Sequence, residues 1–148
     1  MSGWMMRYPN RYLQEIAGIR TAYPQARVLK SPNMSKYCLT CSGRGHNENL
    51  AVVATLVTPA GHAYPVIMVY PCEFPNRLPG VWPLKALRAG TPHQFSDKRI
   101  CLTENEHDNR VTGAQMLGLA YGWFLCYDIW CKTGKFPENN YGKHRIRR

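Results

Sequence analysis

Five of the chain's eleven prolines lie between residues 71 and 92, and they limit what this part of the chain can form. Proline has no backbone amide to donate, so it interrupts helices and central strands. We therefore expect an irregular segment here. Its apolar residues are Phe74, Leu78, Val81, Trp82 and Leu84. These side chains predict an ordered loop packed against a core rather than a linker.

The chain before this segment shows one helical pattern followed by short strand patterns. After Pro9, apolar residues recur mostly three or four positions apart until Tyr23-Pro24, which predicts a helix over 9–22. Strand-forming residues then occur in four short runs, at 27–29, 37–40, 50–57 and 64–70. Because turn residues separate these runs at close spacing, we expect an antiparallel meander of four strands.

The chain after this segment shows little regular pattern until about Arg110. Thr112 and Gln115 then have the spacing of a capping box, which predicts the start of a long helix. Its expected core stripe consists of Met116, Leu119, Ala120, Trp123, Tyr127 and Trp130. Gly134 and Pro137 are typical stop signals. The whole pattern predicts an α+β fold with one sheet and flanking helices.

Length and composition indicate a single domain. A chain of 148 residues with 45% apolar side chains can bury one substantial core. We expect the domain to cover 1–137 and a basic flexible tail to cover 138–148. No apolar run is long enough for a membrane span and no signal peptide pattern is present, so we expect a cytoplasmic protein without a membrane partner. The six cysteines are expected to be free thiols.

The formal net charge is +10, and the basic excess lies in the first 44 and the last 17 residues. Such an excess favours solubility, or attracts an acidic protein or a nucleic acid. One alternative function is therefore a basic nucleic-acid-binding module that uses the termini and exposed tyrosines such as Tyr8, Tyr12 and Tyr141. We do not expect a nucleic-acid partner; charges clustered on one face would favour one, but a sequence does not show a face.

Cys101 is the strongest candidate for a reactive residue. It follows His93, Lys98 and Arg99, and nearby cations favour the thiolate, which is the nucleophilic form of cysteine. The surrounding loop would keep the thiol accessible. The alternative is an inert core cysteine, because the neighbouring Ile and Leu are also compatible with a short buried strand.

The order of these features resembles that of the ubiquitin-conjugating enzymes over about residues 7–137. A helix and a four-strand meander precede a proline-rich turn, a polar tripeptide and an Ile-Cys-Leu reactive site. The tripeptide here is Thr91-Pro92-His93, which ends eight residues before Cys101. In the eukaryotic enzymes it is His-Pro-Asn at the same distance. The proline turn corresponds to Tyr70-Pro71, Phe74-Pro75 and Leu78-Pro79.

The resemblance implies an enzyme with a ubiquitin-conjugating-like fold and no cofactor. Cys101 would be the acyl-accepting nucleophile of a cysteine-dependent acyltransferase, and Thr91 and Pro92 would shape the active-site loop. His93 takes the place of the Asn that supports the oxyanion in the family. A histidine can donate a similar hydrogen bond and can also titrate near neutral pH, which makes His93 a candidate oxyanion support or general base. The alternative is a structural loop histidine.

Two departures from the eukaryotic pattern mean that the ligase-docking surfaces of those enzymes are not expected here. Asn109 stands where those enzymes have a Trp, about eight residues after Cys101, and the chain ends soon after one long helix. The closing segment 122–137, together with His93 in place of Asn, resembles the prokaryotic branch, and within it the stand-alone conjugating-enzyme-like proteins of short type II CBASS antiphage operons. That likeness implies a thioester with the C-terminus of a cGAS-like nucleotidyltransferase, and no dedicated activating enzyme.

Two other sites remain as alternatives. A cysteine hydrolase or protease would combine Cys101 with His107 or His93 and with Asp97 or Asp108. The polar run after Cys101 is expected to be a solvated loop, or to orient an incoming amine; it comprises Glu104, Glu106, His107 and Asp108.

A zinc site is the weaker alternative. Cys38, Cys41 and His46 have the spacing of the first three ligands of a zinc knuckle, but Ala51 occupies the expected fourth position. We therefore expect no metal.

Overall fold

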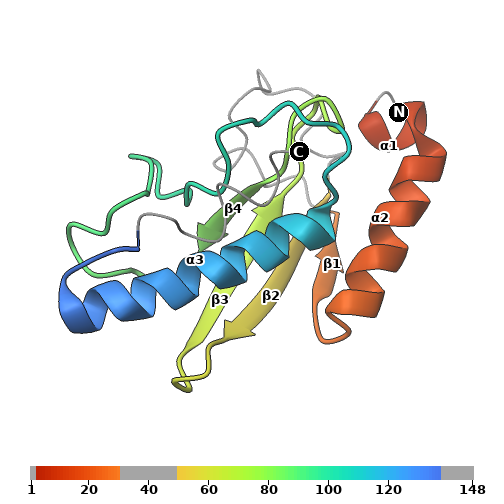
Figure 1. The fold of residues 1–148 in the computed structure, drawn as a ribbon. Coiled ribbons are helices and arrows are strands. Elements are labelled where there is room, and N and C mark those ends of the chain that lie inside the picture. The colour runs from red at the N-terminus through yellow and green to blue at the C-terminus, as the bar shows by residue number, and fades with distance from the viewer. Residues whose placement is uncertain (1–2, 31–49, 138–148) are drawn as a thin grey trace.

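The computed structural model describes residues 3–30 and 50–137. Its helices and strands, in chain order, are α1 (Trp4–Arg7), α2 (Pro9–Ala22), β1 (Arg27–Leu29), β2 (Ala51–Val57), β3 (Ala63–Val69), β4 (Gly80–Pro83) and α3 (Gly113–Thr133). The protein therefore has the predicted α+β class, with helices on both sides of a strand region in the sequence (Figure 1). The predicted strand at 37–40 and the predicted tail at 138–148 lie outside the described residues.

The four described strands form one antiparallel sheet in the order β1-β2-β3-β4. β2 and β3 pair along their whole length, from Ala51 opposite Val69 to Val57 opposite Ala63. Branched and aromatic residues fill these strands, as expected for a pleated and half-buried surface. The predicted helix over 9–22 and the predicted strand at 27–29 are confirmed, and those at 50–57 and 64–70 agree with β2 and β3 within one residue at each end.

β4 corrects the expectation that residues 71–92 are irregular throughout. Gly80–Pro83 form a strand that pairs with β3, with Val81 opposite Met68. Because β4 has a full strand partner on one side only, and Pro83 is its last residue, proline removes no central ladder bond. Leu84 was expected to pack in this segment, but its side chain is 45% exposed.

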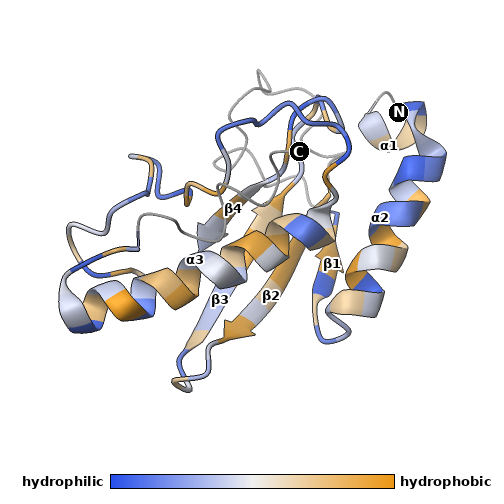
Figure 2. Ribbon diagram, in the orientation of Figure 1, coloured by the Kyte–Doolittle hydropathy of each residue, from blue (hydrophilic) through white to orange (hydrophobic). Residues whose placement is uncertain are grey.

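The helices cover one face of the sheet, where the main core lies. α3 crosses this face and α2 stands beside β1 (Figure 1). Apolar residues are concentrated in β2, β3 and α3, whereas the long connecting loops are mainly hydrophilic (Figure 2). Among the fully buried side chains are Leu50, Val52, Val66, Met68, Tyr70, Phe74, Leu117 and Phe124. A smaller cluster around Ile67, Val69 and Trp82 lies on the opposite face.

A buried carboxylate joins α2 to the start of α3. Glu15 is 1% exposed and accepts hydrogen bonds from Arg11 at 2.9 Å, from the Tyr70 hydroxyl at 2.6 Å and from the Gly113 amide at 2.8 Å. A buried carboxylate is tolerated when its oxygens are paired in this way. Gly113 permits the contact, since a Cβ there would lie 2.0 Å from the Tyr70 hydroxyl.

The predicted ends of α3 are confirmed. The Thr112 hydroxyl accepts a hydrogen bond from the Gln115 amide, and the Gln115 side chain accepts one from the Thr112 amide, which completes the capping box. Gly134 ends the helix with a left-handed φ of 80°. Although α3 has 21 residues, none of the described helices is long and apolar enough to cross a membrane.

The cysteines only partly match the expectation of free thiols. Cys101, Cys126 and Cys131 are not in a disulfide. Cys72 is disulfide-bonded. The prediction was wrong at this position, because composition and the lack of a signal peptide pattern cannot show which thiols the fold brings together.

Candidate active site around Cys101

Cys101 lies between two buried residues on a segment that docks against the edge of the sheet. The Ile100 amide donates a hydrogen bond to the carbonyl of Val81 in β4 at 3.0 Å. Ile100 and Leu102 are 2% and 4% exposed, whereas Cys101 is half-buried. Successive side chains of an extended segment point in opposite directions. The apolar neighbours therefore anchor the segment in the core and leave the thiol outside it.

Residues 93–101 form a short hairpin that brings His93 next to Cys101. The Cys101 amide donates to the His93 carbonyl at 2.9 Å, and the Phe95 amide donates to the Arg99 carbonyl at 2.8 Å. Lys98 has a positive φ of 79°, which is uncommon outside glycine and marks the turn. The two candidate catalytic residues, which are eight positions apart in the sequence, are therefore in direct backbone contact.

His93 is fixed by groups far away in the sequence. Its φ is 56°, and its carbonyl also accepts a hydrogen bond from the indole Nε1 of Trp123 at 3.2 Å. Its ring centroid lies 4.9 Å from that of Phe136. The sequence assigned Trp123 only to the core stripe and gave Phe136 no role at the site. No spacing rule links three positions so far apart, so only the fold reveals this arrangement.

Thr91 closes the turn that leads into the hairpin. Its amide and its hydroxyl both donate to the carbonyl of Arg88. The Arg88 amide in turn donates to the Tyr127 hydroxyl at 2.9 Å, and its guanidinium donates to the Cys131 carbonyl at 3.0 Å. Pro92, which is half-buried, then connects this turn to His93. The segment before the hairpin is therefore held against α3.

Arg99 braces the hairpin from its other side. Its guanidinium pairs with Glu106 at 3.0 Å and lies 4.1 Å from the centre of the Phe95 ring. Glu106 also pairs with Arg77 at 3.3 Å. A Cβ on Gly80 would lie 2.7 Å from the Arg99 side chain, so glycine leaves room for it in β4. Glu106, which is shared by Arg77 and Arg99, therefore offsets part of the positive charge that Arg99 brings to the hairpin.

The side chains proposed for a hydrolase are engaged elsewhere. Nδ1 of His107 lies 3.1 Å from the carbonyl of Asn76. Asp108 binds the Arg110 guanidinium through both oxygens at 2.9 Å, and this pairing holds the pKa of Asp108 at about 2. Asp97 accepts from a backbone amide two residues further on. His107 and Asp108 therefore do not form a pair with each other.

The described residues contain no group of three or more side chains suited to hold a metal ion. The possible zinc ligands Cys38, Cys41 and His46 lie outside the described residues. A scan against protein-family models found no match, and searches of curated proteins and of solved structures found no significantly similar chain.

Proposed function

We propose that the protein is an acyl carrier and transferase that holds the C-terminus of another protein as a thioester on Cys101. The observation that carries this proposal is the half-buried thiol between buried Ile100 and Leu102, with its amide bound to the carbonyl of His93. This arrangement suits an anchored nucleophile beside an assisting residue. It also agrees with the spacing of the reactive site in the ubiquitin-conjugating enzymes, whose fold we propose for this chain.

The proposed chemistry has two steps. In the first, the Cys101 thiolate attacks the carbonyl of an activated acyl donor, forms a carbon–sulfur bond and expels the donor's leaving group. In the second, an amine attacks the resulting thioester, loses a proton as the amide forms, and releases the thiolate. A free carboxylate is not reactive enough for the first step, so the donor must be an existing thioester or an acyl bond of similar energy.

His93 is the residue that we propose to assist both steps. Its imidazole would stabilise the oxyanion of each tetrahedral intermediate or accept the proton of the attacking amine. Its backbone carbonyl accepts from the Cys101 amide and from the Trp123 indole, and these bonds orient the residue beside Cys101. Thr91 and Pro92 would shape the loop that presents the ring.

The proposed partner is the C-terminus of a cGAS-like nucleotidyltransferase in the bacterial cytoplasm. Acylation by this partner would regulate the synthesis of its second messenger during antiphage defence. The support is the likeness of the segment 122–137 and of the His93 substitution to the stand-alone enzymes of short type II CBASS operons. The proposal needs no cofactor, no membrane and no dedicated activating enzyme.

The experiment combines the protein with the nucleotidyltransferase of its own operon, prepared as a C-terminal thioester of a small thiol so that the acyl donor is activated, and measures intact mass and mobility on non-reducing gels. Wild type should form a covalent adduct that reductant and hydroxylamine remove. Cys101→Ser should form a more stable ester, and Cys101→Ala should form none. Cys131→Ser is the matched control, because Cys131 is also a half-buried cysteine outside any disulfide but lies on α3; its adduct should match that of wild type.

Three outcomes would contradict the proposal. An adduct that persists in Cys101→Ala would move the acyl site to another residue. Cleavage of the partner without any adduct would favour the cysteine hydrolase. No reaction, combined with salt-sensitive binding to nucleic acid that survives Cys101→Ala, would favour the binding module.

A further inference from the structure

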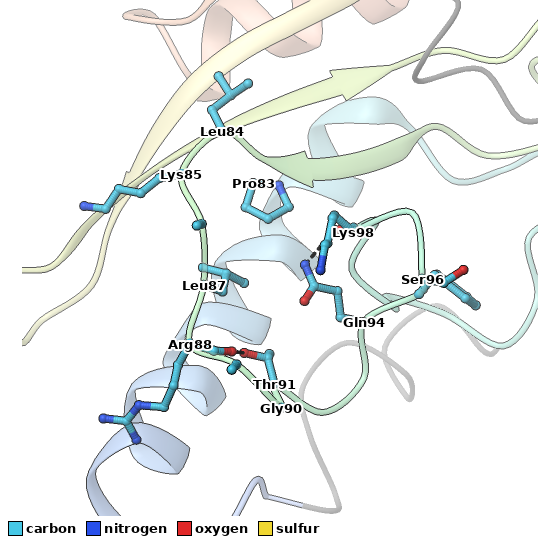
Figure 3. Close-up of a pocket in the computed structure, with 13 residues that line it drawn as sticks. Pro83, Leu84, Lys85, Leu87, Arg88, Gly90, Thr91, Gln94, Ser96 and Lys98 are labelled. Atoms are coloured by element: carbon cyan, nitrogen blue, oxygen red, sulfur yellow. Dashed lines mark hydrogen bonds between the residues drawn. The ribbon is translucent and has the colours of Figure 1, made fainter.

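A groove lies along one side of the hairpin that carries Cys101. It has a volume of about 440 Å³ and runs between the end of β4 with the segment that follows it, residues 83–91, and the hairpin residues 94–98. In Figure 3 the side chains of Leu87, Gln94 and Lys98 lie between these two segments, with Pro83 at the end of the groove. The side chain of Gln94 donates to the carbonyl of Lys98 at 2.8 Å and steadies the hairpin wall.

The charge of the groove is of one sign. Among the described residues that line it, the cations are Lys85, Arg88 and Lys98, and none is acidic. The Lys85 and Arg88 side chains extend outward from the rim in Figure 3, whereas that of Lys98 lies beside the hollow. Charges on a rim still act over about 8 to 10 Å at physiological ionic strength. The potential in the groove is therefore positive and favours a negatively charged occupant.

The groove is connected to the reactive cysteine through the hairpin itself. Gln94, which lines the groove, pairs with Ile100, the residue before Cys101. Lys98, at the far end of the hairpin, is three residues from Cys101, which corresponds to about 10 Å of extended chain. A peptide whose last residue is attached to Cys101 would thus reach Lys98 with its third to fifth residues from the end.

We propose that this groove binds the acidic C-terminal segment of the protein that is acylated on Cys101, with carboxylates three to five residues before the end of that segment. This inference rests on the proposed function and adds to it the substrate class that the site selects. The apolar side chains of Pro83 and Leu87 provide contacts for an aliphatic residue between the carboxylates.

A peptide fits the groove better than a nucleic acid does. Single-stranded nucleic acids bind by stacking their bases on exposed aromatic rings. Among the described residues that line the groove, Phe95 is the only aromatic one, and the Arg99 guanidinium lies 4.1 Å from the centre of its ring. This cation occupies one face of the ring, which leaves a base little stacking surface, whereas a carboxylate needs only the lysines.

The binding test uses the Cys101→Ala variant, so that no covalent reaction interferes, and three fluorescent ten-residue peptides. The first has glutamates three to five residues from its C-terminus, the second has glutamines there, and the third has the glutamates at its N-terminal end. The first should bind about five- to tenfold more tightly than the other two, and this difference in affinity should become smaller at high salt. When Lys98→Glu and Lys85→Glu are both added to the Cys101→Ala variant, the preference for the first peptide should disappear.

The matched control is Arg27→Glu, which makes the charge change of a single lysine substitution but on β1, at the opposite edge of the sheet. It should keep the preference for the first peptide. Equal affinity for the three peptides would overturn the inference. Tighter binding of a single-stranded oligonucleotide than of the acidic peptide, with the same loss in Lys98→Glu, would also overturn it.

A second readout separates this inference from the proposed function. The same peptides, prepared as C-terminal thioesters of a small thiol, are mixed with wild type, and transfer to Cys101 is followed by intact mass. If all three peptides bind with equal affinity and are transferred to Cys101 at equal rates, the acyltransferase proposal stands and the proposal that the groove binds acidic peptides is overturned. Charge-dependent binding without any transfer to Cys101 would overturn the acyltransferase and leave the groove as a site for acidic peptides.

Discussion

The indole Nε1 of Trp123 donates a hydrogen bond to the backbone carbonyl of His93 at 3.2 Å, across thirty residues of sequence. The same oxygen accepts the amide of Cys101 at 2.9 Å. One carbonyl therefore ties the reactive hairpin to the longest helix of the protein. The position of Cys101 depends on α3 as well as on the edge of the sheet.

Trp123→Phe should loosen the hairpin while it keeps most of the aromatic packing. The loss of one buried hydrogen bond should lower the free energy of unfolding by about 1 kcal/mol. Transfer from a peptide thioester to Cys101 should slow several-fold, since the hairpin is less well held. The control is Tyr64→Phe, which removes the hydroxyl that binds Asp128. A comparable slowing in the control would show that transfer follows global stability instead.

Substitutions at His93 should separate its side-chain role from its backbone role. Its φ of 56° is tolerated by Asn and Gly but strained for most other residues. His93→Asn should therefore retain most aminolysis of the Cys101 thioester and lose the pH dependence that an imidazole gives. His93→Gly should keep the backbone and slow aminolysis by about 100-fold. If wild type and His93→Gly show equal rates of aminolysis in a single-turnover discharge of the Cys101 thioester, the role of His93 is structural only.

Glu15→Ala should destabilise the fold without touching the site. It leaves the Tyr70 hydroxyl and the Gly113 amide without their shared acceptor, and it breaks the ion pair with Arg11. Loss of one partner of a buried pair predicts a decrease of about 3 kcal/mol in the free energy of unfolding, measured with urea. Gln14→Ala, at an exposed position of α2, should change it by less than about 0.5 kcal/mol. Similar values for the two variants would refute the role of Glu15.

Two glycines of α3 should respond to alanine with opposite signs. In Gly113→Ala the new Cβ would lie 2.0 Å from the Tyr70 hydroxyl and 2.9 Å from a Glu15 oxygen, which predicts a loss of about 2 kcal/mol. In Gly118→Ala the nearest atom to the new Cβ would be the Tyr23 hydroxyl at 3.9 Å, so the better helix propensity of alanine should stabilise the fold by roughly 0.5 to 1 kcal/mol. Thermal unfolding of both variants checks the contrast, and a stable Gly113→Ala would contradict it.

Asp128 should make stability depend on pH on the acid side. Burial raises the pKa of its carboxyl, but hydrogen bonds from Thr58, Tyr64 and His62 together lower it below its usual value. A carboxyl with a lower pKa in the folded state stabilises the fold above about pH 4, and this contribution is lost as pH falls through the folded pKa. Asp128→Asn should therefore be less stable than wild type at pH 7, and the difference should shrink towards pH 2 in urea titrations. A difference that stays constant with pH would exclude this role.

Much of the secondary structure was determined by signals within a few residues of each other. Pro9, the capping pair Thr112 and Gln115, and Gly134 mark the ends of α2 and α3, because helix capping depends on adjacent backbone groups. The apolar runs of β1, β2 and β3 could be predicted for the same reason. The sequence also placed Cys101 and His93 in one non-helical segment.

Contacts between distant parts of the chain were decided by the tertiary structure alone. β4 exists because β3 supplies its hydrogen-bonding partner, although prolines surround it. The burial of Glu15 and the contact of Trp123 with His93 join residues that no local pattern relates. Local chemistry acts over a few residues, whereas the exposure of Cys101, the hairpin that orients it and the groove beside it depend on which distant surfaces the fold brings together.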